Sequence, residues 1–182
     1  VVSANGLLSK RFPAFEYRPQ QASMLSAVTQ AYNDGQHLIV EGGTGVGKSV
    51  AYLIPSILFA AKSGSRVIVS TNTINLQEQL LGKDIPDLLR ALEEGGLMPA
   101  GQVKACSLKG RANYFCVRRW SHLARSDTLS VDEARVLSKC LVWLEDTELG
   151  DRAELNLAGR DKALWGRVSA GDKGRCSGLR EG

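Results

Sequence analysis

A glycine-rich octapeptide at residues 42–49 constrains the fold of this chain more than any other feature. It fits the pattern G-x-x-x-x-G-K-[ST] and follows a short apolar segment, residues 37–41, that is predicted to be a buried strand. A largely apolar helix is predicted next, over residues 49–62 despite Pro55, and then a β-branched strand over residues 66–70. Two strands joined by a helix in this way lie parallel in one sheet. The sequence therefore predicts an α/β domain with a parallel sheet.

The octapeptide has the chemistry of a phosphate-binding loop. Its glycines let the backbone curl so that consecutive N–H groups face phosphate oxygens, and the following helix adds the positive end of its dipole. We expect Lys48 to reach the β- and γ-phosphates of ATP and the Ser49 hydroxyl to ligate Mg²⁺, so these two form the expected catalytic pair. The alternative is a flexible glycine-rich turn, but the flanking strand and helix favour the phosphate loop. The expected nucleotide site contains Gly42, Gly43, Thr44, Gly45, Val46, Gly47, Lys48 and Ser49.

Phosphoryl transfer also needs an acidic group that holds magnesium and positions water. Residues 141–146 offer a candidate, because apolar residues there precede Glu145 and Asp146. These apolar residues continue a helical stripe that begins near Val131, whereas a central parallel strand is β-branched and bounded by turns. We therefore expect the acidic motif to lie beyond Gly182, so that this chain binds ATP but hydrolyses it poorly.

The rest of the pattern divides the chain into two regions. The further predicted elements are helices over residues 20–32, 74–81, 85–92 and 131–143 and a strand over residues 102–107. Basic and aromatic residues begin to interleave near Gly110. We therefore predict one domain over residues 1–110 and a second over residues 111–182.

Composition and charge limit the class of protein. A length of 182 residues suits one domain and part of another. The net charge of +4 and the pI near 9.0 mildly favour a polyanionic partner. Neither an apolar run of about 18 residues nor a signal-like start is present, so we expect a cytosolic protein without a membrane partner. Because the chain starts at Val1 without a methionine and stops in a charged, glycine-rich stretch, we expect a fragment.

The cysteines do not form the close C-x-x-C pairs of zinc ribbons, although a structural zinc site stays open. Cys106 falls inside a predicted strand and Cys140 on the apolar stripe of a helix, where free cysteine is a common core residue. Cys116 and Cys176 lie in loop-like, charged surroundings. Only the last two are therefore candidate metal ligands.

Several stretches of this sequence are similar to motifs of one family of motor enzymes, namely residues 17–21, 41–49, 70–80 and 109–116. By these motifs the chain resembles the DinG- and XPD-like iron-sulfur DNA helicases of superfamily 2, and among them the bacterial DinG-like members. The resemblance covers most of the chain up to Trp120. It implies a partial RecA-like P-loop NTPase domain with a parallel sheet, followed by the start of a mostly helical iron-sulfur cluster domain.

The resemblance also implies roles for particular residues. Arg18 and Gln21 belong to the element that recognises adenine, with Gln21 as the amide reader of the base. The expected contacts to single-stranded DNA are Thr71, Asn72, Thr73, Gln77, Lys109 and Arg111. The short polar side chains of residues 71–73 suit phosphate oxygens, but Thr and Asn there also suit the N-cap of the next helix, and both possibilities stay open.

A basic and aromatic set also fits a surface that screens phosphates and stacks bases. The set comprises Lys109, Arg111, Arg118, Arg119, Tyr114, Phe115 and Trp120. The alternative is a solvated basic face with the aromatic rings in the core. For the cysteines, the resemblance implies a [4Fe-4S] cluster with Cys116 as its first ligand, Cys176 as its second and two more ligands beyond residue 182.

Together these expectations describe an ATP-dependent DNA helicase that translocates on single-stranded DNA, with 5′ to 3′ polarity implied by the resemblance. We expect it to work in DNA repair or replication in the bacterial cytoplasm, at the nucleoid, with a second RecA-like domain of the same full-length chain as partner. The alternatives are a P-loop kinase or nucleotide switch without nucleic-acid function, and a truncated module that only binds. A kinase would leave Gln21 and the stretch 71–79 unexplained.

Overall fold

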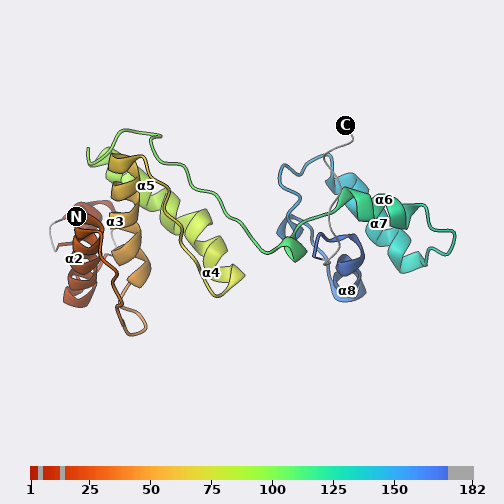
Figure 1. Cartoon of the computed structure of the whole chain (residues 1–182), viewed down its shortest axis with the longest axis horizontal. Coiled ribbons are helices and arrows are strands. Elements are labelled where there is room, and N and C mark those ends of the chain that lie inside the picture. The colour runs from red at the N-terminus through yellow and green to blue at the C-terminus, as the bar shows by residue number, and fades with distance from the viewer. Residues whose placement is uncertain (4–5, 13–14, 172–182) are drawn as a thin grey trace. The chain divides into compact units, whose positions relative to one another are not determined.

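The computed structural model describes residues 1–3, 6–12 and 15–171, and the chain divides into two compact units, Val1–Ser107 and Leu108–Gly182 (Figure 1). The division lies close to the domain boundary that the sequence predicts after Gly110. No helix among the described residues is long and apolar enough to cross a lipid bilayer.

The first unit is built from helices, and all of them except α1 lie at positions that the sequence predicts. They are α1 (Leu7–Arg11), α2 (Pro19–Asp34), α3 (Lys48–Ser63), α4 (Ile74–Gln79) and α5 (Ile85–Glu94), with a turn of π-helix, Leu80–Asp84, between α4 and α5. The start of α2 is favoured by Pro19 at its first position, where no N–H is needed. Its end is set by Gly35, which adopts the left-handed conformation with φ of 62°. The predicted helices of this unit are confirmed.

The core of the first unit lies where α3 packs against α2 and α5 (Figure 1). The ring of Tyr32 on α2 stacks on Phe59 of α3 with centroids 4.6 Å apart, and its hydroxyl lies 2.9 Å from Ser56 Oγ. The buried apolar side chains include Leu53, Ile54, Ile57, Leu88, Ala91 and Leu92. This packing fixes α2 beside α3 and so fixes the loop that precedes α3.

The predicted strands are extended segments that pair with no neighbour within the described part of the chain. Residues 37–41, 66–70 and 102–107 carry no ladder there, and the parallel sheet is not seen. Ile39 and Ile68 are 99% and 91% exposed, although the pattern predicts them in a sheet core. The reason is physical, because a helix satisfies its backbone hydrogen bonds within itself whereas a strand needs another strand beside it.

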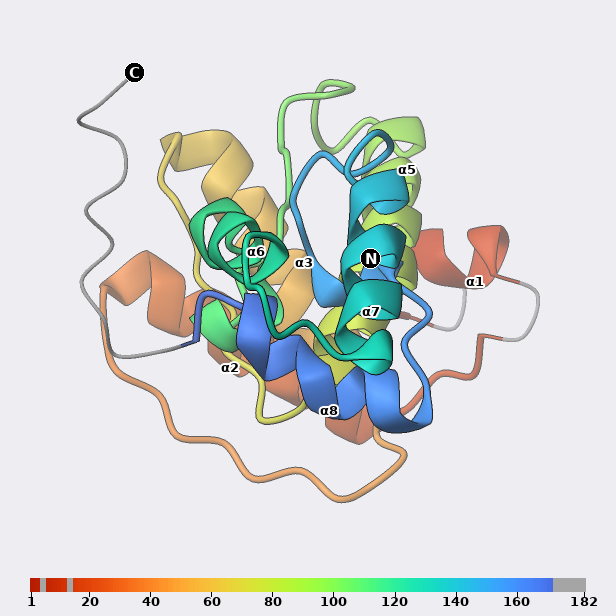
Figure 2. The ribbon, with the colours of Figure 1, turned by 90° about the vertical axis from the view of Figure 1, so that its right-hand side faces the viewer.

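The described residues of the second unit form three α-helices around one core. They are α6 (Val117–Ala124), α7 (Val131–Trp143) and α8 (Gly159–Val168), with short 3₁₀ turns at Arg111–Asn113 and Arg152–Glu154. Both α6 and α7 lie against α8 (Figure 2). A capping box starts α7, since Glu133 N donates to Ser130 Oγ at 3.2 Å and Ser130 N donates to Glu133 Oε2 at 3.0 Å. Because α7 runs to Trp143, the prediction that residues 141–146 are not a buried strand is confirmed.

Aromatic rings fill the centre of the second unit. Phe115, Trp143 and Trp165 meet with centroids 5.8 to 6.5 Å apart. The indole nitrogen of Trp165 donates to the carbonyl oxygen of Ala112 at 2.7 Å, so the ring also holds the preceding turn.

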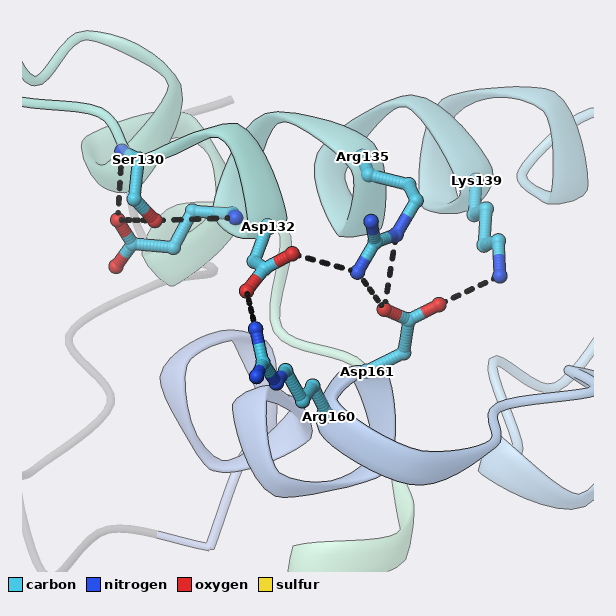
Figure 3. Close-up of polar contacts among 7 residues, drawn as sticks. Ser130, Asp132, Arg135, Lys139, Arg160 and Asp161 are labelled. Carbon is cyan, nitrogen blue, oxygen red and sulfur yellow. Dashed lines mark hydrogen bonds and ion pairs between the residues drawn. The ribbon is translucent and has the colours of Figure 1, made fainter.

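A charged cluster joins α7 to α8 around Asp161 (Figure 3). Its carboxylate, only 5% exposed, accepts from Lys139 Nζ at 2.6 Å and from Arg135 Nε and Nη2 at 3.1 and 2.8 Å. The same guanidinium donates to Asp132 at 2.7 Å. Hydrogen bonds from Lys139 and then Arg135 lower the pKa of Asp161 below its usual value.

We predict that Asp161→Asn lowers the melting temperature of the second unit and reduces its acid sensitivity. A carboxylate whose pKa is lowered by folding stabilises the fold above about pH 4, and this contribution is lost as the pH falls through the folded-state pKa. All three tryptophans lie in this unit, so their fluorescence reports its melting between neutral and acidic pH. Asp146→Asn, at an exposed site, is the matched control and should keep the full acid dependence. Equal acid dependence in Asp161→Asn and the wild type would contradict the assignment.

Candidate nucleotide and nucleic-acid site

The loop at residues 42–47 runs directly into the N-terminus of α3. Gly45 and Gly47 adopt positive φ values of 81° and 80°, which ordinary residues rarely adopt, and α3 begins at Lys48. Lys48 Nζ folds back over the loop and donates to the carbonyl oxygens of Gly42 at 2.9 Å and Gly43 at 2.8 Å. Gly43, Thr44 and Gly45 at the tip of the loop are exposed. The structure therefore places a cation and a helix N-terminus at one accessible turn, as phosphate binding requires.

Two side chains from the start of α2 hold this loop. Arg18 Nη1 donates to the carbonyl oxygen of Gly45, and Gln21 Nε2 donates to that of Gly47 at 3.0 Å. A Cβ atom at Gly47 would lie 2.1 Å from Gln21 Nε2, so a larger residue there would have to displace the Gln21 amide. The predicted nucleotide residues Arg18 and Gln21 are thus brought to the phosphate loop, where each contacts a residue more than 25 positions away in the sequence.

The side-chain oxygen of Gln21 is an acceptor without a hydrogen bond among the described residues. Its side chain is 5% exposed, and Oε1 has no hydrogen-bond partner among the described residues. A buried oxygen of this kind calls for a donor, since leaving it unpaired costs free energy. An exocyclic amine such as that of adenine would satisfy it, and this role of Gln21 stays a prediction.

The segment before α4 is arranged as a helix cap. Thr73 is the N-cap of α4, and its Oγ1 accepts from Leu76 N at 3.3 Å. Thr71 Oγ1 donates to the carbonyl oxygen of Thr73 at 3.1 Å, while the side chain of Asn72 is exposed. The capping role expected for this segment is therefore confirmed for Thr73. Contacts of residues 71–73 and of Gln77 on α4 with DNA stay a prediction.

The side chain of Lys109 forms a buried ion pair inside the second unit. Its Nζ lies 2.7 Å from Asp151 Oδ2, and the two side chains are only 5% and 11% exposed. Its backbone nitrogen donates to Tyr114 Oη at 2.8 Å. Contact of Lys109 with DNA, which stays a prediction, would have to compete with this ion pair, whereas Arg111 is exposed. Sequence reasoning missed Asp151, because no local pattern links it to Lys109.

Two aromatic members of the predicted surface pack against the core. Phe115 and Trp120 pack against the buried cluster of the second unit. Trp120 Nε1 donates to the carbonyl oxygen of Leu137 at 3.2 Å, which ties α6 to α7. For these two residues, the structure agrees with the alternative that the aromatic rings lie in the core. It does not support base stacking by them.

The cysteines occupy different environments. Cys140 is fully buried on α7, as predicted, and burial raises the pKa of its thiol to about 11. Cys106 is exposed, which corrects the expectation of a core position, because residues 102–107 have no neighbouring strand to cover them. Cys116 is half-buried at the N-cap of α6, and Cys176 lies outside the described residues. The described ranges hold no group of three or more His, Cys, Asp or Glu side chains that could hold a metal ion.

Comparison with known proteins finds one matching family model and several similar helicases. Residues 18–89 match the family described as DEAD/DEAH box helicase, which implies a RecA-like fold for this segment. The chain is 37% identical over 165 residues to the 3′-5′ exonuclease DinG of Bacillus subtilis, which covers 91% of this chain and 17% of that protein. It is 35% identical over 171 residues to the ATP-dependent DNA helicase YoaA of Escherichia coli, which covers 91% of this chain and 24% of the relative. It is 34% identical over 176 residues to the ATP-dependent helicase DinG of Mycobacterium tuberculosis, a match that covers 89% of this chain and 26% of that protein.

Over most of its length the chain is similar to a segment of DinG-like helicases. It spans about a quarter of the length of these relatives or less. The loop at residues 42–47 and its contacts with Arg18 and Gln21 all fall within the matched segment.

For this DinG-like chain we predict that Gly47→Ala is more destabilising than Gly45→Ala. Both glycines have nearly the same φ, so an alanine costs about 1–2 kcal/mol of backbone strain at either position. Only at Gly47 does the new Cβ meet Gln21, since a Cβ at Gly45 has nothing within 4 Å. Urea unfolding followed by circular dichroism measures the difference. In a Gln21→Ala background the two substitutions should become similar, and equal costs in the wild-type background would contradict the contact.

We also predict that Cys140 resists alkylation in the folded chain. With a pKa of about 11, only about one thiol in a thousand is ionised at pH 8, and burial also blocks the reagent. Iodoacetamide followed by peptide mass spectrometry should show early labelling of the exposed Cys106 and none of Cys140. Cys140 should react once urea unfolds the chain, and rapid labelling of Cys140 without urea would contradict its burial.

Proposed function

We propose that this chain is the ATP-binding part of an ATP-dependent DNA helicase motor that translocates on single-stranded DNA. The observation that carries the proposal is the phosphate loop at the start of α3, held by Arg18 and Gln21 from α2. Supporting it, two of the three relatives compared are named ATP-dependent helicases. The 5′ to 3′ polarity and the work in repair or replication at the bacterial nucleoid rest on the resemblance.

ATP would engage this site through residues already gathered around the loop. Lys48 would leave the carbonyl oxygens of Gly42 and Gly43 for the β- and γ-phosphates, a stronger charge-assisted contact. Ser49, in the first turn of α3, would ligate Mg²⁺, which supplies charge neutralisation of the phosphates. Gln21 Oε1 would accept from the adenine amine while Nε2 stays on Gly47, so one side chain would link the base to the loop.

The organisation of the complete protein forms the rest of the proposal. Residues 1–110 would be the front of a RecA-like domain with a parallel sheet, and the exposed apolar side chains of Ile39 and Ile68 suit burial within it. Residues 111–182 would begin a domain with a [4Fe-4S] cluster held by Cys116, Cys176 and two later ligands. The acidic magnesium motif and a second RecA-like domain that supplies an arginine would also come from the longer protein.

A P-loop kinase or nucleotide switch is the competing function, and it would share the phosphate loop. It would not explain the match of residues 18–89 to helicases. The relative named a 3′-5′ exonuclease shares only 17% of its length with this chain. The shared part contains the phosphate loop, so we assign the motor role to this chain.

We predict that Lys48→Ala abolishes ATP binding measured by calorimetry, because the phosphates lose their cation. Lys62→Ala, at the exposed end of α3, removes the same charge and should leave the affinity unchanged. Unchanged affinity in Lys48→Ala would contradict the nucleotide site.

For the helicase, we expect single-stranded DNA to bind with an affinity that falls steeply with salt. No binding at low salt would favour the kinase.

A further inference from the structure

Arg18 brings a second cation to the phosphate loop. It is the N-cap residue of α2, and its Nη1 donates to the carbonyl oxygen of Gly45 at the tip of the loop. Its Nη2 lies 2.9 Å from Glu16 Oε2, so one carboxylate partly balances its charge. Lys48, at the start of α3, donates to two other carbonyl oxygens of the same loop. Cations from the starts of two helices therefore converge on one loop.

The two residues of the predicted adenine element contact different parts of the loop. Gln21 Nε2 donates to the carbonyl oxygen of Gly47, next to the first residue of α3, and the Gln21 side chain is buried. Arg18 instead contacts Gly45, and its side chain is 42% exposed. A guanidinium has no acceptor and so cannot pair with an exocyclic amine, whereas the Gln21 oxygen can. The two side chains thus differ in position and in chemistry.

The loop itself offers donors for an anion. In the part of the chain that the structure describes, no backbone N–H of residues 43–47 donates to another backbone carbonyl. Phosphate oxygens can accept from these N–H groups while the cations lie on the carbonyl oxygens. A guanidinium also binds phosphate more strongly than a neutral carbonyl, because both partners are charged and the planar fork matches two oxygens. Arg18 would therefore exchange a weaker contact for a stronger one when phosphates enter the loop.

We infer that Arg18 binds the phosphate end of the nucleotide and not its base. The inference rests on the proposed function, and it assigns one residue of the predicted adenine element to the opposite end of the ligand. Glu16 competes with the phosphates for the same guanidinium, through a side chain that is 74% exposed. Arg18 then raises the affinity of the loop for phosphate, and Glu16 lowers it.

Calorimetry with ATP and with inorganic tripolyphosphate, each as its magnesium complex, tests the inference. Arg18→Ala should weaken the binding of both ligands about tenfold, since a charge-assisted contact at a half-exposed site is lost. Arg11→Ala is the matched control, because Arg11 is also 42% exposed and pairs with Glu94 at 3.0 Å. This control should bind both ligands as the wild type does. Weaker binding of ATP alone would place Arg18 at the base, and unchanged binding of both ligands would remove it from the site, so either result would overturn the inference.

A second variant separates a phosphate contact from a role in bracing the loop. Glu16→Gln removes the competing charge and should strengthen tripolyphosphate binding about two- to threefold. Glu94→Gln, the corresponding change beside Arg11, should leave it unchanged. If Arg18 only braced the loop, its release from Glu16 would leave binding unchanged or weaken it, and that result would overturn the inference. Because Arg18 stays in place, this arm is decisive even if Arg18→Ala distorts the loop.

The failure of this inference and that of the proposed function give different results. If the wild-type chain binds neither ATP nor tripolyphosphate, the proposed function fails and the inference fails with it. If ATP binds but tripolyphosphate does not, the phosphate end carries too little of the affinity, and the inference is overturned while ATP binding stands. If both ligands bind and neither responds to Arg18→Ala or Glu16→Gln, the nucleotide site stands and Arg18 is excluded from it.

Discussion

The hydrogen bond from Gln21 to the carbonyl oxygen of Gly47 is the contact on which the nucleotide site depends. It joins the first turn of α2 to the turn that starts α3, and a side chain at position 47 would have to displace the Gln21 amide. The packing of α2 on α3, with Tyr32 stacked on Phe59, holds the two partners at this distance. The glycine pattern thus reflects a packing constraint as well as the needs of phosphate binding.

In the second unit, folding buries some residues of the basic and aromatic sequence and leaves others on the surface. The rings of Phe115 and Trp120 join the core, and Lys109 enters a buried ion pair with Asp151. Breaking such a pair would leave a charge uncompensated in the interior, which is strongly destabilising. A residue of this segment that remains on the surface, such as Arg111, is therefore better placed to meet a polyanion.

The sequence correctly predicted features that depend on interactions between residues close together in the chain. The helix over residues 131–143 matches α7, because its capping box and apolar period act within a few residues. The loop at residues 42–47 was identified for the same reason. The predicted strand pairing is not seen, and Cys106 is exposed, because burial of a strand depends on neighbours that the local pattern does not specify. The partner of Lys109 was missed for a similar reason, since it comes from a distant turn.

Gln21 combines a role predicted from a local motif with a contact that depends on residues distant in the sequence. Its resemblance to an adenine reader comes from a local motif, but its contact with Gly47 comes from the packing of two helices. Because Nε2 is engaged by the loop while the buried Oε1 is unpaired, the amide can serve both ends of one nucleotide. A base that offered an acceptor in place of an amine would leave this oxygen unsatisfied, and a buried unsatisfied acceptor costs about 1–3 kcal/mol. Preference for adenine would then arise from the same side chain that orders the phosphate loop.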